Sequence, residues 1–185
     1  SEDTQFEVAA ALRDQIRALE RALEEQRIVS AQFLDQDVFG YFRQADVLEV
    51  AVMHIRQGKL LGRRSFRFAE QEFPDHESIS AFVGLYYDAG NAIPDEVLLP
   101  IAIEDLDAKQ EWLRERAGEQ ASAPAGTTGT EAGGKRGKVE VLVPKRGPRH
   151  ALVELANKNA EVNYSTRRNK QRDTEESLAK LQRRL

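Results

Sequence analysis

The chain has 185 residues, a formal net charge of −4 and no cysteine, which excludes disulfides and cysteine-ligated metal centres. Its hydrophobic content of 41% is enough for one ordinary core with appendages. No apolar run approaches the roughly 20 residues of a membrane span. We therefore expect a cytoplasmic protein that does not enter a membrane.

The charge is distributed unevenly along the chain. Residues 135–185 carry 14 Lys and Arg and 6 Asp and Glu, a net charge of +8. The other 134 residues carry 13 Lys and Arg and 25 Asp and Glu, a net charge of −12. The acidic part argues against a protein that coats nucleic acid uniformly, and the basic part allows a local phosphate-facing surface. A merely solvated charged surface explains this composition equally well.

An amphipathic helix is predicted from Thr4 to about Arg27. Thr4 and Glu7 have the spacing of a capping box, and apolar residues then recur at alternating intervals of three and four. These apolar residues are Ala9, Leu12, Ile16, Leu19 and Leu23. The seam is narrow and the rest of the helix is polar, so the helix needs a partner. That partner could be the domain itself, a missing preceding helix or another protein.

Three meandering strands are predicted next. Asp37–Phe42 forms a short strand, and Val47–Arg56 and Lys59–Phe68 form a hairpin, since Gly58 suits a tight two-residue turn. The second hairpin strand alternates, so its basic residues are expected together on one face. They are Lys59, Arg63 and Arg67. The first hairpin strand is apolar on both faces, which indicates a central strand covered on both sides.

Helices and strands alternate in the rest of the domain. The predicted elements are a helix over Glu77–Ala89, a strand over Glu96–Ile103, a helix over Leu106–Ala117, a strand over Lys138–Pro144 and a helix from His150 to about Ser165. With right-handed crossovers and helices covering both faces, the order is that of a ribonuclease-H-like fold: an α/β mixed sheet, β-β-β-α-β-α-β-α. Residues 118–137 are low in complexity and are expected to form a mobile loop.

The residues that could carry chemistry are sparse. Ribonuclease-H-like nucleases hold two metal ions with clustered carboxylates, and Asp37 lies near the start of the first strand, but no second strong acid clearly converges on it. The three histidines lack ligand spacing, and no phosphate-binding glycine motif is present. The sequence therefore predicts no catalytic residue, no metal and no cofactor, with a metal-dependent nuclease using Asp37 as the alternative.

Basic residues are better candidates for a binding site. A basic turn precedes the last predicted helix, where free N–H groups and the helix dipole also favour phosphate, and a basic tail follows that helix. The turn holds Lys145, Arg146 and Arg149, and the tail holds Arg167, Arg168, Lys170 and Arg172. The tail, residues 166–185, is expected to be weakly helical. We expect weak, sequence-independent and salt-dependent DNA binding, strongest at the turn. A soluble linker is equally compatible with the composition of the tail.

Several segments, in order, resemble UvrC, the nuclease subunit of the bacterial UvrABC excision-repair system. Phe6–Ile16 is similar to the second half of the UVR motif, which pairs UvrC with the tail of UvrB. Shorter segments resemble the central region of UvrC: Asp35-Gln36-Asp37, Gly58–Arg63, Val97–Pro100, Val143–Gly147 and Leu155–Ala160. The first UVR helix, the two nuclease domains and the helix-hairpin-helix module have no counterpart here.

This resemblance implies a fragment of a longer protein. Residues 1–28 would be half a UVR motif, 29–165 the central ribonuclease-H-like domain, and 166–185 a basic linker toward a second nuclease domain. The parent would make dual incisions flanking a DNA lesion, and this part would be a scaffold that engages UvrB and DNA. The UvrB-binding residues would be Phe6, Ala9, Leu12, Arg13, Ile16 and Leu19. A pure protein-interaction module is a further alternative.

Overall fold

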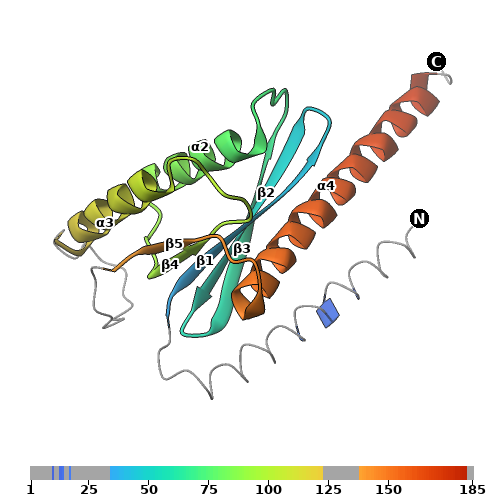
Figure 1. The fold of residues 1–185 in the computed structure, drawn as a ribbon. Helices are drawn as coiled ribbons and strands as arrows, with labels where there is room; N and C mark the ends of the chain where they lie inside the picture. Colours follow the sequence, from blue (N-terminus) through green and yellow to red (C-terminus); the bar gives the residue numbers. More distant parts are fainter. Residues whose placement is uncertain (1–9, 11–12, 15–16, 18–33, 123–137, 183–185) are drawn as a thin grey trace.

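The computed structural model describes residues 34–122 and 138–182, and residues 10, 13, 14 and 17 of the N-terminal segment. Five strands form one sheet in the order β3-β2-β1-β4-β5 (Figure 1). Their bounds are β1 Gln36–Gln44, β2 Val47–Arg56, β3 Lys59–Phe68, β4 Glu96–Leu98 and β5 Glu140–Leu142. The first three strands are antiparallel, β4 is parallel to β1, and β5 is parallel to β4. The predicted mixed sheet and element order are confirmed.

Helices cover both faces of the sheet, as Figure 1 shows. Their bounds are α2 Asp75–Asp88, α3 Leu106–Ser122 and α4 Gly147–Gln182. The helices α2 and α3 pack on one face and α4 packs across the other. In the part of the chain that the structure describes, no helix combines the length and hydropathy needed to span a bilayer.

Strand alternation divides the core into two clusters. Phe39 of β1 and Val50 of β2 pack with the apolar residues of α2 and α3. Val38 of β1 and Met53 of β2 pack instead with residues of α4, among them Leu152. Successive side chains of a strand point to opposite faces, so β1 and β2 must be apolar on both. The prediction that Val47–Arg56 is a central strand is confirmed.

The pairing of β2 with β3 shifts register after His54. Leu60 therefore lies opposite Ile55 and packs with it in the α4-side cluster. Arg63 also reaches α4, where it contacts Asn159. Adjacent strand residues point to opposite faces, so the prediction that Lys59 shares the face of Arg63 is wrong. The physical reason is the irregularity in the ladder, which reverses the alternation at the start of β3.

Several predicted element ends also differ from the structure. The last strand covers Glu140–Leu142 and not Lys138–Pro144, and the last helix begins at Gly147 and not at His150. The strand predicted over Glu96–Ile103 ends at Leu98, two residues before Pro100, which cannot donate to a ladder. The helix α3 continues to Ser122 and takes in the first five residues of the predicted loop, whose remainder lies outside the described residues. The helix α4 runs through residue 165 to Gln182 without a break, so the predicted last helix and the predicted helical tail form one element.

Candidate nucleic-acid interface

Asp37 lies at the start of β1 and is fully buried beneath α2. Its Oδ1 atom is 2.8 Å from Nη1 of Arg56 and 3.0 Å from Nδ1 of His54, both on β2. Its Oδ2 atom accepts a hydrogen bond of 2.8 Å from the Tyr87 hydroxyl. Burial and the nearby Asp37 charge raise the pKa of Tyr87 well above its ordinary value, so this hydroxyl remains a donor.

Both oxygens of Asp37 are thus occupied by protein groups, and Arg56 compensates its charge. Within residues 34–122 and 138–182, no group of three or more histidines and carboxylates is arranged to hold a metal ion. Asp105, which the sequence also places near a strand end, instead accepts a hydrogen bond of 2.7 Å from Ser80. The observed arrangement at Asp37 is a buried ion pair that ties β1 to β2 and α2.

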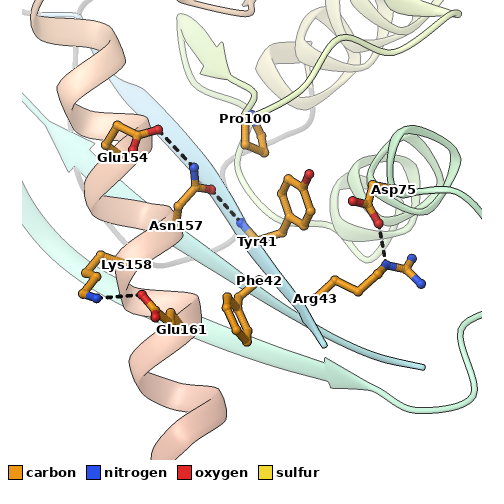
Figure 2. A pocket seen from close by; sticks show the side chains of 9 residues that line it. All are labelled: Tyr41, Phe42, Arg43, Asp75, Pro100, Glu154, Asn157, Lys158 and Glu161. Atoms are coloured by element: carbon orange, nitrogen blue, oxygen red, sulfur yellow. Dashed lines mark hydrogen bonds and ion pairs between the residues drawn. The ribbon is translucent and has the colours of Figure 1, made fainter. Parts of the chain in front are cut away.

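A cleft of about 460 Å³ opens where β1 and β4 part (Figure 2). The strand β4 ends at Leu98 while β1 continues to Gln44, and such crevices beyond the carboxyl ends of parallel strands often bind ligands. The lining residues are Tyr41, Phe42, Arg43, Asp75, Pro100, Glu154, Asn157, Lys158 and Glu161. This cleft is a site that the sequence did not indicate, because it depends on the unequal lengths of two strands.

The charges in this cleft largely compensate one another. Arg43 forms an ion pair with Asp75, and Lys158 lies 2.7 Å from Glu161 on α4 (Figure 2). Since each cation of the cleft already has a carboxylate partner, the cleft offers little attraction for a phosphate group.

The predicted basic turn lies at the start of α4, with Arg149 inside the first turn of the helix, and it serves partly in the fold. Lys145 and Arg146 are exposed. Arg149 instead forms a two-pronged ion pair with Glu96 of β4, with Nε 3.0 Å from Oε2 and Nη2 2.5 Å from Oε1. Glu96 is buried and also accepts a hydrogen bond of 2.6 Å from the side chain of Gln36. The hydrogen bonds to Glu96 raise the pKa of Arg149. Much of its charge is therefore compensated within the domain.

A second set of cations lies where α4 contacts β3 and on the adjoining exposed surface of α4, and we call it the basic seam. Its members are Arg63 and Arg67 of β3 and Arg167, Arg168 and Lys170 of α4. Arg63 donates to Oδ1 of Asn159 (3.1 Å), and Arg67 donates to Oε1 of Gln171 (3.4 Å). The structure thus brings the predicted basic tail beside two of the three cations predicted on the second hairpin strand.

The remaining contacts of the seam centre on Arg167. Its Nη2 atom donates to the Ser65 hydroxyl (3.1 Å), and its Nη1 atom lies 3.3 Å from Oε1 of Glu49. Glu49 is fully buried on β2, and neither of its carboxylate oxygens has a hydrogen-bond partner among the described residues. Burial raises the pKa of Glu49, an effect that Arg167 and Arg67 oppose.

The basic turn and the seam are far apart along α4. Arg149 and Arg167 are 18 residues apart in one continuous helix, which corresponds to about 27 Å at a rise of 1.5 Å per residue. They therefore form two separate positive surfaces.

Of the six residues predicted to bind UvrB, Arg13 alone falls within the described residues, where it is helical and exposed. The other five, Phe6, Ala9, Leu12, Ile16 and Leu19, lie outside the described residues.

Comparison with known proteins identifies the family. A family model for the UvrC Ribonuclease H-like domain matches residues 35–167, which is most of the chain. The chain belongs to this family. The UvrABC system protein C of Anaeromyxobacter sp. (strain Fw109-5) is 41% identical over 180 residues, covering 97% of this chain and 22% of the relative. The protein of the same name from Syntrophus aciditrophicus (strain SB) is 38% identical over 186 residues, covering all of this chain and 27% of the relative.

These matches confirm the resemblance to UvrC and the ribonuclease-H-like fold. The chain spans about a quarter of the length of these curated relatives. The residues matched by the family model include Asp37 and its contacts, the cleft, the basic turn, and Arg63, Arg67 and Arg167 of the seam. Arg168 and Lys170 lie just beyond the matched residues.

Proposed function

We propose that this chain is a non-incising scaffold within a UvrC-type protein of bacterial nucleotide excision repair. It engages DNA weakly through basic surface residues and engages UvrB through its N-terminal segment, in the cytoplasm, while incision resides in other parts of the parent protein. The observation that supports this reading best is the state of Asp37, the carboxylate of the first strand.

Two-metal nucleases need several carboxylates around a shared, accessible position. Asp37 is buried, and its oxygens contact Arg56, His54 and Tyr87. A divalent cation bound there would have to displace the guanidinium of Arg56, and it would gain one carboxylate ligand. The arrangement favours a role for Asp37 in the fold.

Plasmid nicking with Mg²⁺ or Mn²⁺ tests the scaffold against the nuclease alternative. The chain should leave supercoiled plasmid intact, and the Asp37→Asn variant should behave identically. Incision by the wild-type chain that disappears in a folded Asp37→Asn variant would overturn the scaffold reading. Circular dichroism of both proteins establishes that the comparison is between folded chains.

The choice between a DNA-engaging scaffold and a pure protein-interaction module depends on affinity for nucleic acid. Weak binding that is independent of sequence and falls with salt is expected for contacts to phosphates alone. Negligible binding of a random-sequence duplex at 50 mM salt would favour the protein-interaction module.

A further inference from the structure

We propose that the basic seam, and not the basic turn, is the main surface through which this chain contacts the sugar-phosphate backbone of DNA. This inference rests on the proposed function and identifies its DNA-facing surface. Two segments roughly 100 residues apart in the chain converge on it, since Arg167 of α4 donates to Ser65 of β3.

Two arginines of the seam differ from Arg43 and Arg149 in the groups that hold them. Arg43 and Arg149 pair with the carboxylates of Asp75 and Glu96, so their charges are compensated inside the domain. Arg63 and Arg67 are instead held by the neutral amides of Asn159 and Gln171. A neutral partner fixes the direction of a guanidinium without cancelling its charge, so Arg63 is oriented and still attracts an anion. Arg67 is oriented in the same way, and the buried Glu49 opposite it offsets part of its charge.

Among the residues that the structure describes, Glu49 is the carboxylate paired with the seam, and it reaches the seam from the protein interior. It lies opposite Arg67 in the β2–β3 ladder and 3.3 Å from Arg167. Because Glu49 is fully buried, it reaches Arg167 from inside the protein, and the side chain of Arg167 remains 42% exposed. We assign Glu49 the role of a positioning residue that holds Arg167 against the sheet beside Arg67.

The extent of the seam fits a nucleic-acid backbone better than a single acidic side chain. Arg63 and Arg67 are four residues apart on a strand, which separates them by about 13 Å. Arg167 and Lys170 are three residues apart on a helix and are neighbours on its surface. Cations spaced in this way can neutralise successive phosphates, and arginine matches phosphate geometry with two parallel hydrogen bonds.

The basic turn is the natural competitor for this role. It has three exposed cations, Lys145, Arg146 and Arg149, but the charge of Arg149 is compensated by its ion pair with Glu96. The seam has three exposed cations, Arg63, Arg168 and Lys170, besides the two partly buried arginines. Counterion release grows with each phosphate neutralised, so the seam should account for the larger part of the salt dependence.

Fluorescence anisotropy with a labelled random-sequence duplex, over a series of salt concentrations, tests this assignment. The seam variant carries Arg63→Gln, Arg168→Gln and Lys170→Gln, all at exposed positions. The control variant carries Lys145→Gln and Arg146→Gln. The seam variant should flatten the slope of log K against log salt by about 2 to 3, at roughly 0.9 per phosphate contact. The control variant should change the slope by less.

A second variant, Arg63→Lys with Arg168→Lys, retains the charge and should retain the slope. Unchanged affinity and slope in the seam variant, or a larger loss in the turn variant, would overturn the assignment of the seam and leave the DNA-engaging function standing. Absence of DNA binding by the wild-type chain at 50 mM salt would overturn both. Binding of polyglutamate as tight as that of DNA would overturn the choice of nucleic acid as the occupant.

Discussion

Gly40 of β1 lies directly against the backbone of Ala156 in α4. A Cβ atom at position 40 would be 2.2 Å from the carbonyl carbon of Ala156 and 2.3 Å from the nitrogen of Asn157. Glycine is the residue that permits such a close approach of two backbones. The contact is reinforced by Asn157, whose Oδ1 accepts the backbone N–H of Tyr41 at 2.9 Å. Gly40 therefore sets how closely α4 packs on the sheet.

Substitution of Gly40 should be among the more damaging single changes in the domain. Gly40→Ala forces two backbone segments apart and should lower the free energy of unfolding by about 1–3 kcal/mol or more, measured by urea denaturation. Gly62→Ala is the matched control, because it also lies in a strand and a Cβ there would meet no atom within 4 Å. Equal stability of the two variants would contradict this account of the contact.

The sequence predicts the fold correctly where the spacing of apolar residues along a single element determines its place. The two-sided apolar pattern of Val47–Arg56 places that strand in the centre of the sheet, because both its faces are covered. The register of β3 was not predictable in the same way, since the shift after His54 places Leu60 opposite Ile55. One extra residue in a ladder leaves no signature in an alternating sequence.

The candidate site was predictable only in part, because its contacts join distant segments. The basic residues of the tail were evident, but their position beside Arg67 depends on α4 crossing the sheet. The pairing of Arg149 with Glu96 spans 53 residues and requires the parallel placement of β4. Composition located the cations in the sequence but could not show which of them the fold neutralises.

Glu49 should make the stability of the domain depend on pH in a specific direction. Its pKa is raised in the folded state, mainly by burial, so the folded protein binds this proton more tightly than the unfolded chain does. The resulting stabilisation is complete below the unfolded pKa, about 4.3, and is lost as pH rises through the higher folded value. Wild type should therefore lose stability relative to Glu49→Gln over that range.

Urea denaturation at several pH values between 4 and 7 measures this difference, and Glu140→Gln serves as the control. The pKa of Glu140 is lowered by Lys138, so its stabilisation is present above the unfolded pKa and is lost as pH falls. The difference in unfolding free energy between wild type and Glu49→Gln, and that between wild type and Glu140→Gln, should thus change in opposite directions with pH. Parallel pH profiles for Glu49→Gln and wild type would contradict the burial argument.

The N-terminal segment should carry the contact with UvrB. Leu12 and Ile16 belong to the apolar seam of the predicted helix, and a charge placed in a helix–helix contact is costly to bury. Leu12→Asp with Ile16→Asp should abolish capture of the UvrB tail in a pull-down, while the far-ultraviolet spectrum shows a folded domain. Ala10→Asp, at an exposed helical position, should leave the weak binding unchanged. Unchanged capture by the double variant would place the contact elsewhere.

Arg149 provides a test of whether a basic residue serves the fold or a phosphate. Arg149→Ala leaves the buried carboxylate of Glu96 without its two-pronged partner, which should cost about 1–3 kcal/mol of unfolding free energy. Lys145→Ala and Arg146→Ala, at exposed positions, should each change stability by less than about 0.5 kcal/mol. Adding Glu96→Gln to Arg149→Ala should recover part of the loss, because the unpaired charge is removed. The Arg149→Ala variant could instead keep its stability and lower the slope of log K against log salt for DNA binding by about 0.9. That result would make Arg149 a phosphate contact, as the sequence alone predicts.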